Sequence, residues 1–284
     1  MMTSTTEQRT DRLATLRHSA YRIRRNALDM GEVQGQGYIG QALGVADILS
    51  VVYMDQLRYR AEDPHWEGRD RLLLSIGHYA IALYAALAEA GIIPVAELQT
   101  YGSDGSRLPM SGMASYTPGM EISGGSLGHG LTVATGMALG LRYRGNDARV
   151  YNLLSDGELN EGSTWEAAQV CAHYGLDNLT AIVDVNALQA DGPTADVLRT
   201  EPITDKWQAF GWYAVRVDGN DIEALVEGFE DLKAHPGSPS VLICDTSIGR
   251  GVPLLETREK AHFMRVDADE WQIARDQLEE GFRG

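Results

Sequence analysis

Short apolar segments alternate with longer segments of helical periodicity over residues 131–247. The apolar segments read as buried strands and have the sequences ARVYNLL, LTAIVDV, YAVRVD and PSVLICDTS. Between them lie helical patterns, in STWEAAQVCAHYG, TDKWQAFG and DIEALVEGFEDLKAH. Parallel strands need a crossover connection, usually a helix, whereas antiparallel strands can be joined by short hairpins. The alternation therefore predicts an α/β fold in which helices flank a parallel sheet.

The first half of the chain adds helices to this sheet. A charged amphipathic helix is predicted at residues 7–30, followed by a Gly-rich loop and an apolar helix, QALGVADILSVVYMDQL. RLLLS reads as a short strand and HYAIALYAALAEAG as a helix, whereas residues 94–126 show little periodicity and form a long loop of the kind that is usually functional. Because the 284 residues contain no repeat or low-complexity linker, we expect residues 1–284 to form one domain, with a polar, acidic tail at residues 268–284.

Composition limits the possible partners. The chain has 24 Lys and Arg against 40 Asp and Glu, a net charge of -16, which argues against nonspecific binding to nucleic acid or to a membrane surface. No apolar run is long enough for a signal peptide or a membrane span, and Cys171 and Cys244 lie in patterns of buried residues. We expect a soluble, cytoplasmic protein with reduced cysteines. An acidic chain can still bind a phosphorylated ligand through backbone amides or a metal ion.

GQGYIG, at residues 35–40, matches the G-x-G-x-x-G fingerprint of dinucleotide-binding proteins. That fingerprint requires a strand before it, whereas the preceding segment here, RIRRNALDM, has a helical pattern. We therefore interpret the match as a flexible or ligand-adjacent loop rather than as a nucleotide site.

Two polar residues follow consecutive predicted strands. Asp156 comes after ARVYNLL and Asn186 after LTAIVDV, with a helix between them, so both should emerge at the carboxyl ends of parallel strands. A carboxylate and an amide carbonyl offer two hard oxygens to Mg²⁺ or Ca²⁺, and the phosphates of a ligand often complete such a site. Gly157 would let the backbone approach a diphosphate closely. Taken singly, Asp156 could only cap a helix and Asn186 could only make a turn; their joint placement favours a metal–diphosphate site.

The segments SDGELNEG and DVNALQADG together resemble the thiamine diphosphate motif, which begins Gly-Asp-Gly and ends in Asn. RDRLLLSIGHYAIALYAAL, TPGMEISGGSLGHGL and DKWQAFGWYAVRVDGND resemble further segments of the N-terminal, diphosphate-binding half of transketolase. The resemblance extends over nearly the whole chain and implies the thiamine diphosphate-binding fold, with thiamine diphosphate and a divalent cation as cofactors.

The resemblance implies roles for residues around the diphosphate. It gives Asp156, Asn186 and the main-chain carbonyl of Leu188 as ligands of Mg²⁺ or Ca²⁺, and it places Gly157 and His78 near the diphosphate. The alternative for His78 is a residue that only begins a helix.

The resemblance also implies roles farther from the metal. Gly125 and Leu127 would lie beside the aminopyrimidine ring, and His262 near the diphosphate and the substrate. Glu161 and Glu166 would relay protons between paired sites at a subunit contact. The alternatives are a surface histidine in a tail for His262 and ordinary exposed helix residues for the two glutamates.

In transketolase-like proteins a pyrimidine-binding domain follows the present one and carries the glutamate that protonates the aminopyrimidine. The resemblance therefore implies a split enzyme in which a C-terminal transketolase-like subunit supplies that domain. It further implies a heterotetramer with the cofactor bound between unlike subunits, and small-molecule donors and acceptors. Alone, this chain should not turn over.

The sequence departs from the transketolase pattern near the expected substrate. Tyr38 and Ser111 stand where histidines are usual, Ser155 replaces the first Gly of the cofactor motif, and His129 replaces a common Gln. A tyrosine can donate a hydrogen bond as histidine does, but with a different reach and acidity. These differences leave the donor open.

Three functions are compatible with the sequence. The favoured one is a transketolase-like transferase that moves a two-carbon ketol unit from a ketose-type donor to an aldehyde, with His78, His262, Tyr38, Glu161 and Glu166 as candidate catalytic residues. The second is a thiamine-dependent carboligase or dehydrogenase that decarboxylates a 2-oxo acid. The third is a noncatalytic binding module, which the presence of Asp156, Gly157 and Asn186 disfavours.

Overall fold

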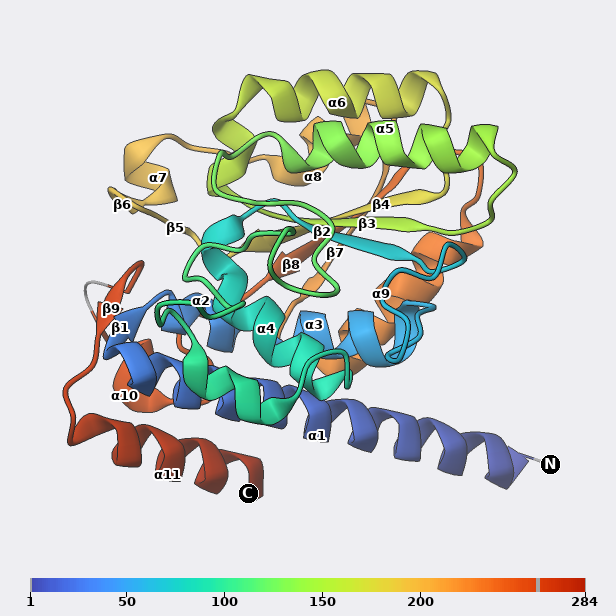
Figure 1. Cartoon of the computed structure of the whole chain (residues 1–284). Coiled ribbons are helices and arrows are strands. Elements are labelled where there is room, and N and C mark those ends of the chain that lie inside the picture. The colour runs from blue at the N-terminus through green and yellow to red at the C-terminus, as the bar shows by residue number, and fades with distance from the viewer. Residues whose placement is uncertain (1, 259–260, 284) are drawn as a thin grey trace.

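The computed structural model describes residues 2–258 and 261–283, and the side chains among them from residue 7 onward. Its centre is a five-stranded sheet in the order β2-β3-β4-β8-β7, and every neighbouring pair in it is parallel (Figure 1). The strands are β2 (Arg71–Leu74), β3 (Val150–Ser155), β4 (Leu179–Val185), β8 (Ser240–Asp245) and β7 (Tyr213–Asp218). The predicted α/β fold with a parallel sheet flanked by helices is confirmed.

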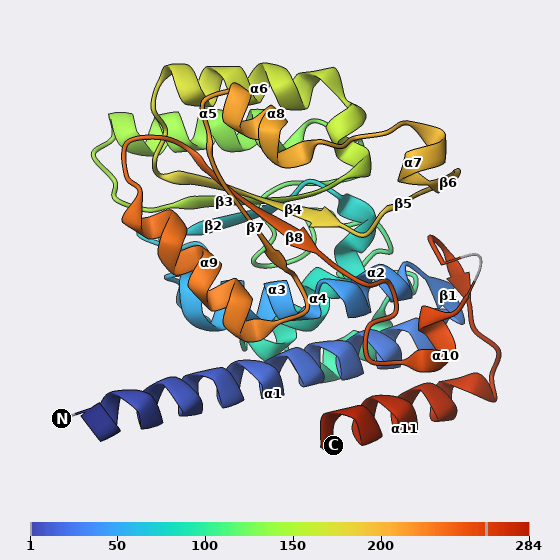
Figure 2. The same ribbon diagram turned by 180° about the vertical axis from the view of Figure 1, so that it is seen from behind.

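Each face of the sheet has its own apolar core, because side chains alternate along every strand. Leu73 and Leu154 pack on the face covered by α5 (Gly130–Tyr143), α6 (Gly162–His173) and α8 (Ile203–Ala209). Leu74 and Leu153 pack on the opposite face, which is covered by α3 (Ala46–Val51), α4 (Ala80–Glu89) and α9 (Ile222–Ala234) (Figure 2). Because both faces are covered, the central strands are continuous apolar runs rather than alternating ones.

Two terminal helices add to the core on the face of the sheet that α3, α4 and α9 cover. The predicted helix at residues 7–30 is part of the longer α1 (Met2–Gln34). The tail, expected only to be polar and acidic, forms a helix, α11 (Glu270–Arg283), which lies against α1 (Figure 1). Its Trp271, Ala274 and Leu278 are buried at a spacing of three and four residues, so the tail carries an apolar stripe that the sequence reading missed.

The remaining elements are short. The apolar segment predicted as one helix is broken at Val45 into α2 (Ile39–Gly44) and α3, and it ends in a π-helical turn, η1 (Val52–Gln56). The others are β1 (Gln36–Gly37), η2 (Gly77–Tyr79), η3 (Val95–Thr100), η4 (Gly157–Asn160), β5 (Leu188–Gln189), β6 (Gly192–Pro193), α7 (Thr194–Val197), α10 (Pro253–Glu256) and β9 (Met264–Arg265). Strand β1 pairs with β9, and β5 with β6.

The long loop predicted at residues 94–126 contains only the 3₁₀ helix η3 and then crosses the carboxyl end of β2. At this crossing Gly77 and Gly124 are in backbone contact, since a Cβ placed on Gly77 would lie 2.3 Å from the carbonyl carbon of Gly124. The amide of Gly112 donates to the carbonyl of Gly77, and that of Gly124 to Gly112. Only glycine permits this approach, which brings the loop to the strand ends.

Cys171 and Cys244 are both buried and unbridged, as predicted. In the described part of the chain, no helix has the length and apolar character that crossing a membrane requires.

Candidate functional site

Asp156 and Asn186 lie together at the carboxyl ends of β3 and β4, as their positions after two consecutive strands predict. The two strands pair in parallel with Ser155 opposite Asp184, and the amide of Asp156 donates to the carbonyl of Asp184 at 2.9 Å. The local fold places them there because β3 ends at Ser155, β4 ends at Val185, and α6 connects the two strands.

The Asp156 carboxylate is almost completely buried, with 1% of the residue exposed. Its two oxygens accept hydrogen bonds from the amides of Gly157 (2.8 Å) and Ala187 (2.9 Å), and from the hydroxyl of Thr194 (3.3 Å). Burial, together with the nearby Asp184 carboxylate, raises the pKa of Asp156 to about 7. The chain thus holds a carboxylate at a position where its charge is disfavoured.

Asn186 is oriented by neighbours on both sides of its amide group. Its Nδ2 donates to the Tyr79 hydroxyl (2.8 Å) and to Asp184 Oδ2 (2.6 Å), which turns the carbonyl oxygen the other way, where it accepts from the Leu188 amide (3.0 Å). A carbonyl oxygen has two lone pairs, so Asn186 Oδ1 retains one for a ligand.

Leu188 opens the β5–β6 hairpin opposite Pro193, and Ala187 before it has a positive φ of 59°. The Thr194 amide donates to the carbonyl of Ala187, and Pro193 has no N–H to donate. The carbonyl of Leu188 therefore receives no bond from its hairpin partner, and a strained backbone position precedes it.

Asp184 is a residue of the site that the sequence reading missed. It is buried within β4 and accepts hydrogen bonds from Tyr79 (2.9 Å), Thr246 (2.5 Å) and Asn186. Burial raises the pKa of this carboxyl. The available signal was a charged residue inside the otherwise apolar strand LTAIVDV, because a buried carboxylate is rare unless it is paired or functional.

These residues fit a divalent cation. Among the described residues, no Lys, Arg or His forms an ion pair with Asp156 or Asp184. The described residues also contain no group of three or more His, Cys, Asp or Glu side chains that would hold a metal. The candidate donors are instead one carboxylate, one amide carbonyl and one main-chain carbonyl, all oxygens, which suits Mg²⁺ or Ca²⁺ rather than zinc.

Tyr38, His78 and His262 meet although they are far apart in the sequence. The Tyr38 ring lies 4.6 Å from His78 and 5.4 Å from His262, and the two histidine rings are 5.7 Å apart. Gln41 on α2 donates to the carbonyl of His262 at 2.7 Å. Burial, with a smaller contribution from His262, lowers the pKa of His78 to about 4, and burial also lowers that of His262. Both imidazoles therefore favour the neutral form at pH 7. His262 is half-buried and is not the surface histidine of its alternative interpretation, whereas His78 does lie in the turn before α4 but also contacts Tyr38.

The loop GQGYIG lies beside this cluster. It follows helix α1 rather than a strand of the parallel sheet, and its Tyr38 contacts both histidines. The segment therefore lacks the strand that the dinucleotide fingerprint requires, as expected, and its place beside a ligand stays a prediction.

The other predicted residues lie at the rim. Gly125 is exposed with a positive φ of 131°, and Leu127 is partly buried against the core. Glu161 is the N-terminal cap residue of α6 and Glu166 lies one turn along that helix, and neither is buried. Within this single chain they do not contact the Asp156–Asn186 pair, so their relay role stays a prediction.

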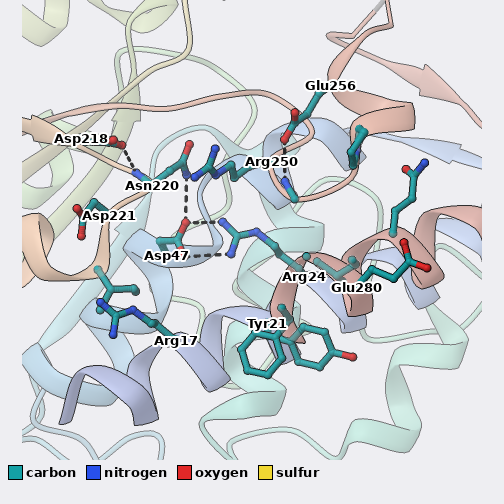
Figure 3. Close-up of a pocket in the computed structure, with 17 residues that line it drawn as sticks. Arg17, Tyr21, Arg24, Asp47, Asp218, Asn220, Asp221, Arg250, Glu256 and Glu280 are labelled. Atoms are coloured by element: carbon teal, nitrogen blue, oxygen red, sulfur yellow. Dashed lines mark hydrogen bonds and ion pairs between the residues drawn. The ribbon is translucent and has the colours of Figure 1, made fainter. Parts of the chain in front are cut away.

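A cavity of about 900 Å³ lies outside this site, between α1, α11 and the loop before α9. Figure 3 shows Arg24 and Asp47 paired among the residues that line it, with Asn220 bonded to the same carboxylate. Its lining mixes guanidinium groups with carboxylates such as Asp218 and Asp221 and includes none of the predicted site residues. The buried carboxylates and the histidine cluster lie at the strand ends instead, which makes the strand ends the candidate functional site.

Comparisons with known proteins name the family. Residues 16–283 match the family model described as "Transketolase, thiamine diphosphate binding domain". The chain is 63% identical over 261 residues to a transketolase family protein of Sinorhizobium fredii, covering 92% of this chain and 94% of that one. It is 40% identical over 244 residues to one subunit of the apulose-4-phosphate transketolase of Actinobacillus succinogenes, covering 86% of this chain and 88% of that subunit.

A solved structure agrees with the family match. The transketolase of Campylobacter jejuni superposes with a TM-score of 0.87 at 29% identity, over 94% of this chain and 43% of that chain. This chain therefore spans less than half the length of that transketolase. Because the family model, the sequence relatives and the solved structure agree, we conclude that the chain belongs to the transketolase family and corresponds to the thiamine diphosphate-binding domain of that family.

Proposed function

We propose that this chain is the thiamine diphosphate- and magnesium-binding subunit of a split transketolase, which transfers a two-carbon ketol unit from a ketose-type donor to an aldehyde. The observation that carries the proposal is the buried Asp156 carboxylate beside Asn186, at the carboxyl ends of two parallel strands and, among the described residues, without a cationic partner. Open α/β sheets bind ligands at this edge. A divalent cation with a diphosphate would offset the two buried carboxylates there.

Each residue then has a defined task. Asp156, Asn186 and the carbonyl of Leu188 would hold the cation, and Gly157 would let backbone amides approach the diphosphate. The neutral His78 and His262 can each donate one hydrogen bond and accept another, which suits them to hold phosphate or substrate oxygens in place. When bound, thiamine diphosphate supplies the electron sink for cleaving the donor, while the protein orients the reactants and excludes water.

A second polypeptide completes the proposed enzyme. The chain covers 43% of a solved transketolase, and one relative is named as one of the subunits of its transketolase. We infer that residues 1–284 form one domain and that a partner of C-terminal transketolase type carries the pyrimidine-binding domain. A heterotetramer with the cofactor between unlike subunits follows from this arrangement, with Glu161 and Glu166 at the contact.

The test is a calorimetric titration of thiamine diphosphate with Mg²⁺ into this chain, alone and after mixing with the candidate partner. We expect tight binding in the mixture, weak or no binding to the single chain, and loss of binding when a chelator removes the divalent cation. Donor turnover should also require both chains. If neither sample binds the cofactor, the chain is a noncatalytic module and the proposal fails.

Tyr38→His is expected to change the donor preference of the complex more than its cofactor affinity. The Tyr38 ring contacts both histidines of the cluster and Phe263, and these ring contacts do not involve Asp156 or Asn186. A site built around one hydrogen-bonding group discriminates against donors that need another. We expect the ratio of kcat/KM for two donors to change about 10-fold or more, since this needs only about 1.4 kcal/mol, while the Kd for thiamine diphosphate stays similar.

Tyr38→Phe is the matched control, because it keeps the ring contacts and removes only the hydroxyl. A ketose donor gained by Tyr38→His would support ketol transfer. A native preference for a 2-oxo acid would favour the decarboxylating alternative, and an unchanged donor profile would contradict a donor-contact role for Tyr38.

A further inference from the structure

Glu158, in the turn η4 directly after Asp156 and Gly157, is fully buried. Its Oε1 accepts hydrogen bonds from the Ser75 hydroxyl and from the amide of Gly128 (2.8 Å). Ser75 in turn accepts from the amide of Gly130 at 3.0 Å. One carboxylate oxygen therefore joins the end of β2, the end of the long loop and the turn that carries Asp156.

The loop is held at Gly128 from both sides. While the Gly128 amide donates to Glu158, its carbonyl accepts from the Ser163 hydroxyl (2.9 Å) on α6. The approach is close, because a Cβ on Gly128 would lie 2.4 Å from Ser163 Oγ and 2.7 Å from Glu161 Cβ, and φ is +81° there. Gly125 and Leu127, the residues expected beside the aminopyrimidine, immediately precede this anchored point.

The second carboxylate oxygen of Glu158, Oε2, lowers the stability of the fold without an evident structural benefit. Within the described residues this buried atom has no hydrogen-bond partner, and no basic side chain forms an ion pair with Glu158. A buried carboxylate with one unsatisfied oxygen is unfavourable for stability. An apolar or neutral residue would fill this space with a smaller loss of folding stability. The bonds that Oε1 makes to the loop therefore point to a role in function rather than in stability.

We propose that Glu158 is a positioning residue, which ties the loop segment 124–129 to the Asp156–Gly157 turn and so sets the distance between the two parts of the cofactor site. The proposal rests on the proposed function, because it concerns where the loop holds Gly125 and Leu127 relative to the diphosphate. In this role Glu158 acts through its hydrogen bonds with the Gly128 amide and the Ser75 hydroxyl, and it does not contact the reacting atoms.

The first measurement is hydrogen exchange of residues 124–130 in the cofactor-free chain. Glu158→Ala should speed exchange of the Gly128 amide by about 10-fold or more, because this amide loses its hydrogen bond to a carboxylate. Exchange of the Gly130 amide should rise as well, because its acceptor, Ser75, loses the carboxylate that orients it. Glu158→Gln keeps a side-chain oxygen that can accept from the Ser75 hydroxyl and from the Gly128 amide, so it should restore slow exchange. Glu97→Ala is the matched control, since Glu97 lies in another 3₁₀ helix, η3, where it pairs with Arg107 near the surface. It should leave residues 124–130 unchanged.

The second measurement is the Kd for thiamine diphosphate with Mg²⁺ in the complete two-chain complex. Glu158→Ala should raise it about 10-fold or more, and Glu158→Gln should bring it back toward the wild-type value. If Glu158→Ala does not fold, Ser75→Ala takes its place, because it removes the hydroxyl that links the Gly130 amide to Glu158 while the carboxylate and its bond from the Gly128 amide remain.

The outcomes distinguish a failure of the positioning role of Glu158 from a failure of the proposed cofactor-binding function. Unchanged exchange at residues 124–130 overturns the positioning role, and so does faster exchange with an unchanged Kd. A Kd that rises equally in Glu158→Ala and Glu158→Gln overturns it as well, because charge rather than the accepted bonds would then matter. If the wild-type complex binds no thiamine diphosphate, the proposed function fails, and the cofactor role of Glu158 fails with it, whatever the exchange shows.

Discussion

Asp156→Ala is expected to abolish metal-dependent binding of thiamine diphosphate while the chain stays folded. Asp156 would supply the only carboxylate among the three proposed metal ligands. Removing an outer-shell partner of a metal ligand already costs about 10–100-fold in affinity, so loss of the charged ligand itself should exceed that range. Calorimetric titration of the two-chain complex with Mg²⁺ and thiamine diphosphate measures it.

The cofactor-free fold should tolerate this change because the carboxylate is under electrostatic strain. Its pKa is about 7 in the folded chain against 3.8 for the unperturbed group, so the folded state binds more protons than the unfolded state between these values. The contribution of Asp156 to stability therefore falls as pH rises through this window, and the alanine variant should lose that pH dependence. Urea unfolding at pH 5 and pH 8 tests this.

Asp205→Ala, which removes an exposed carboxylate on α8, is the control for Asp156→Ala. It should change neither cofactor affinity nor unfolding. Cofactor affinity that is unaffected by Asp156→Ala would remove the metal assignment.

Asp47→Ala should destabilise the chain by about 3 kcal/mol or more, because it leaves a buried guanidinium without its partner. Arg24 and Asp47 are 8% and 5% exposed, and both Arg24 amino groups bond the Asp47 carboxylate. Arg24 Nε donates to the carbonyl of Leu43 (2.9 Å), and Asn220 donates to Asp47 (3.1 Å). The pair thus joins α1 to α3 and to the loop before α9. Urea unfolding monitored by circular dichroism gives the change in the free energy of unfolding.

Two further variants separate the buried charge from the loss of packing. The double variant Arg24→Met/Asp47→Leu should recover much of the lost stability, since an apolar pair leaves no unpaired charge. Glu97→Ala breaks the more exposed pair with Arg107 and should cost about 1 kcal/mol or less. An Asp47→Ala variant as stable as Glu97→Ala would show that Arg24 finds other partners or water in the cavity beside it.

The order of strands and helices could be predicted because each element has its own local pattern of apolar residues. The strands at residues 150–155 and 179–185 lie within or at the edge of the apolar runs that predict them, and a parallel sheet follows from the helix between them. Asp156 and Asn186 come just after those runs. That the two side chains lie close together could therefore be predicted without knowing any contact between distant segments. The tail helix α11 was missed although Trp271, Ala274 and Leu278 stand at helical spacing in the sequence, because the many charged residues between them suggested only a polar tail.

What the sequence by itself determined is therefore the α/β class and the meeting of Asp156 and Asn186 at the strand ends. The tertiary structure decided how these candidate ligands are oriented: Asp184 and Tyr79 turn the Asn186 amide, and Glu158 anchors the loop at Gly128. It also brought Tyr38 against His262, from opposite ends of the chain. The physical reason is that such contacts join segments far apart in sequence, and they depend on how helices and loops pack rather than on any local preference.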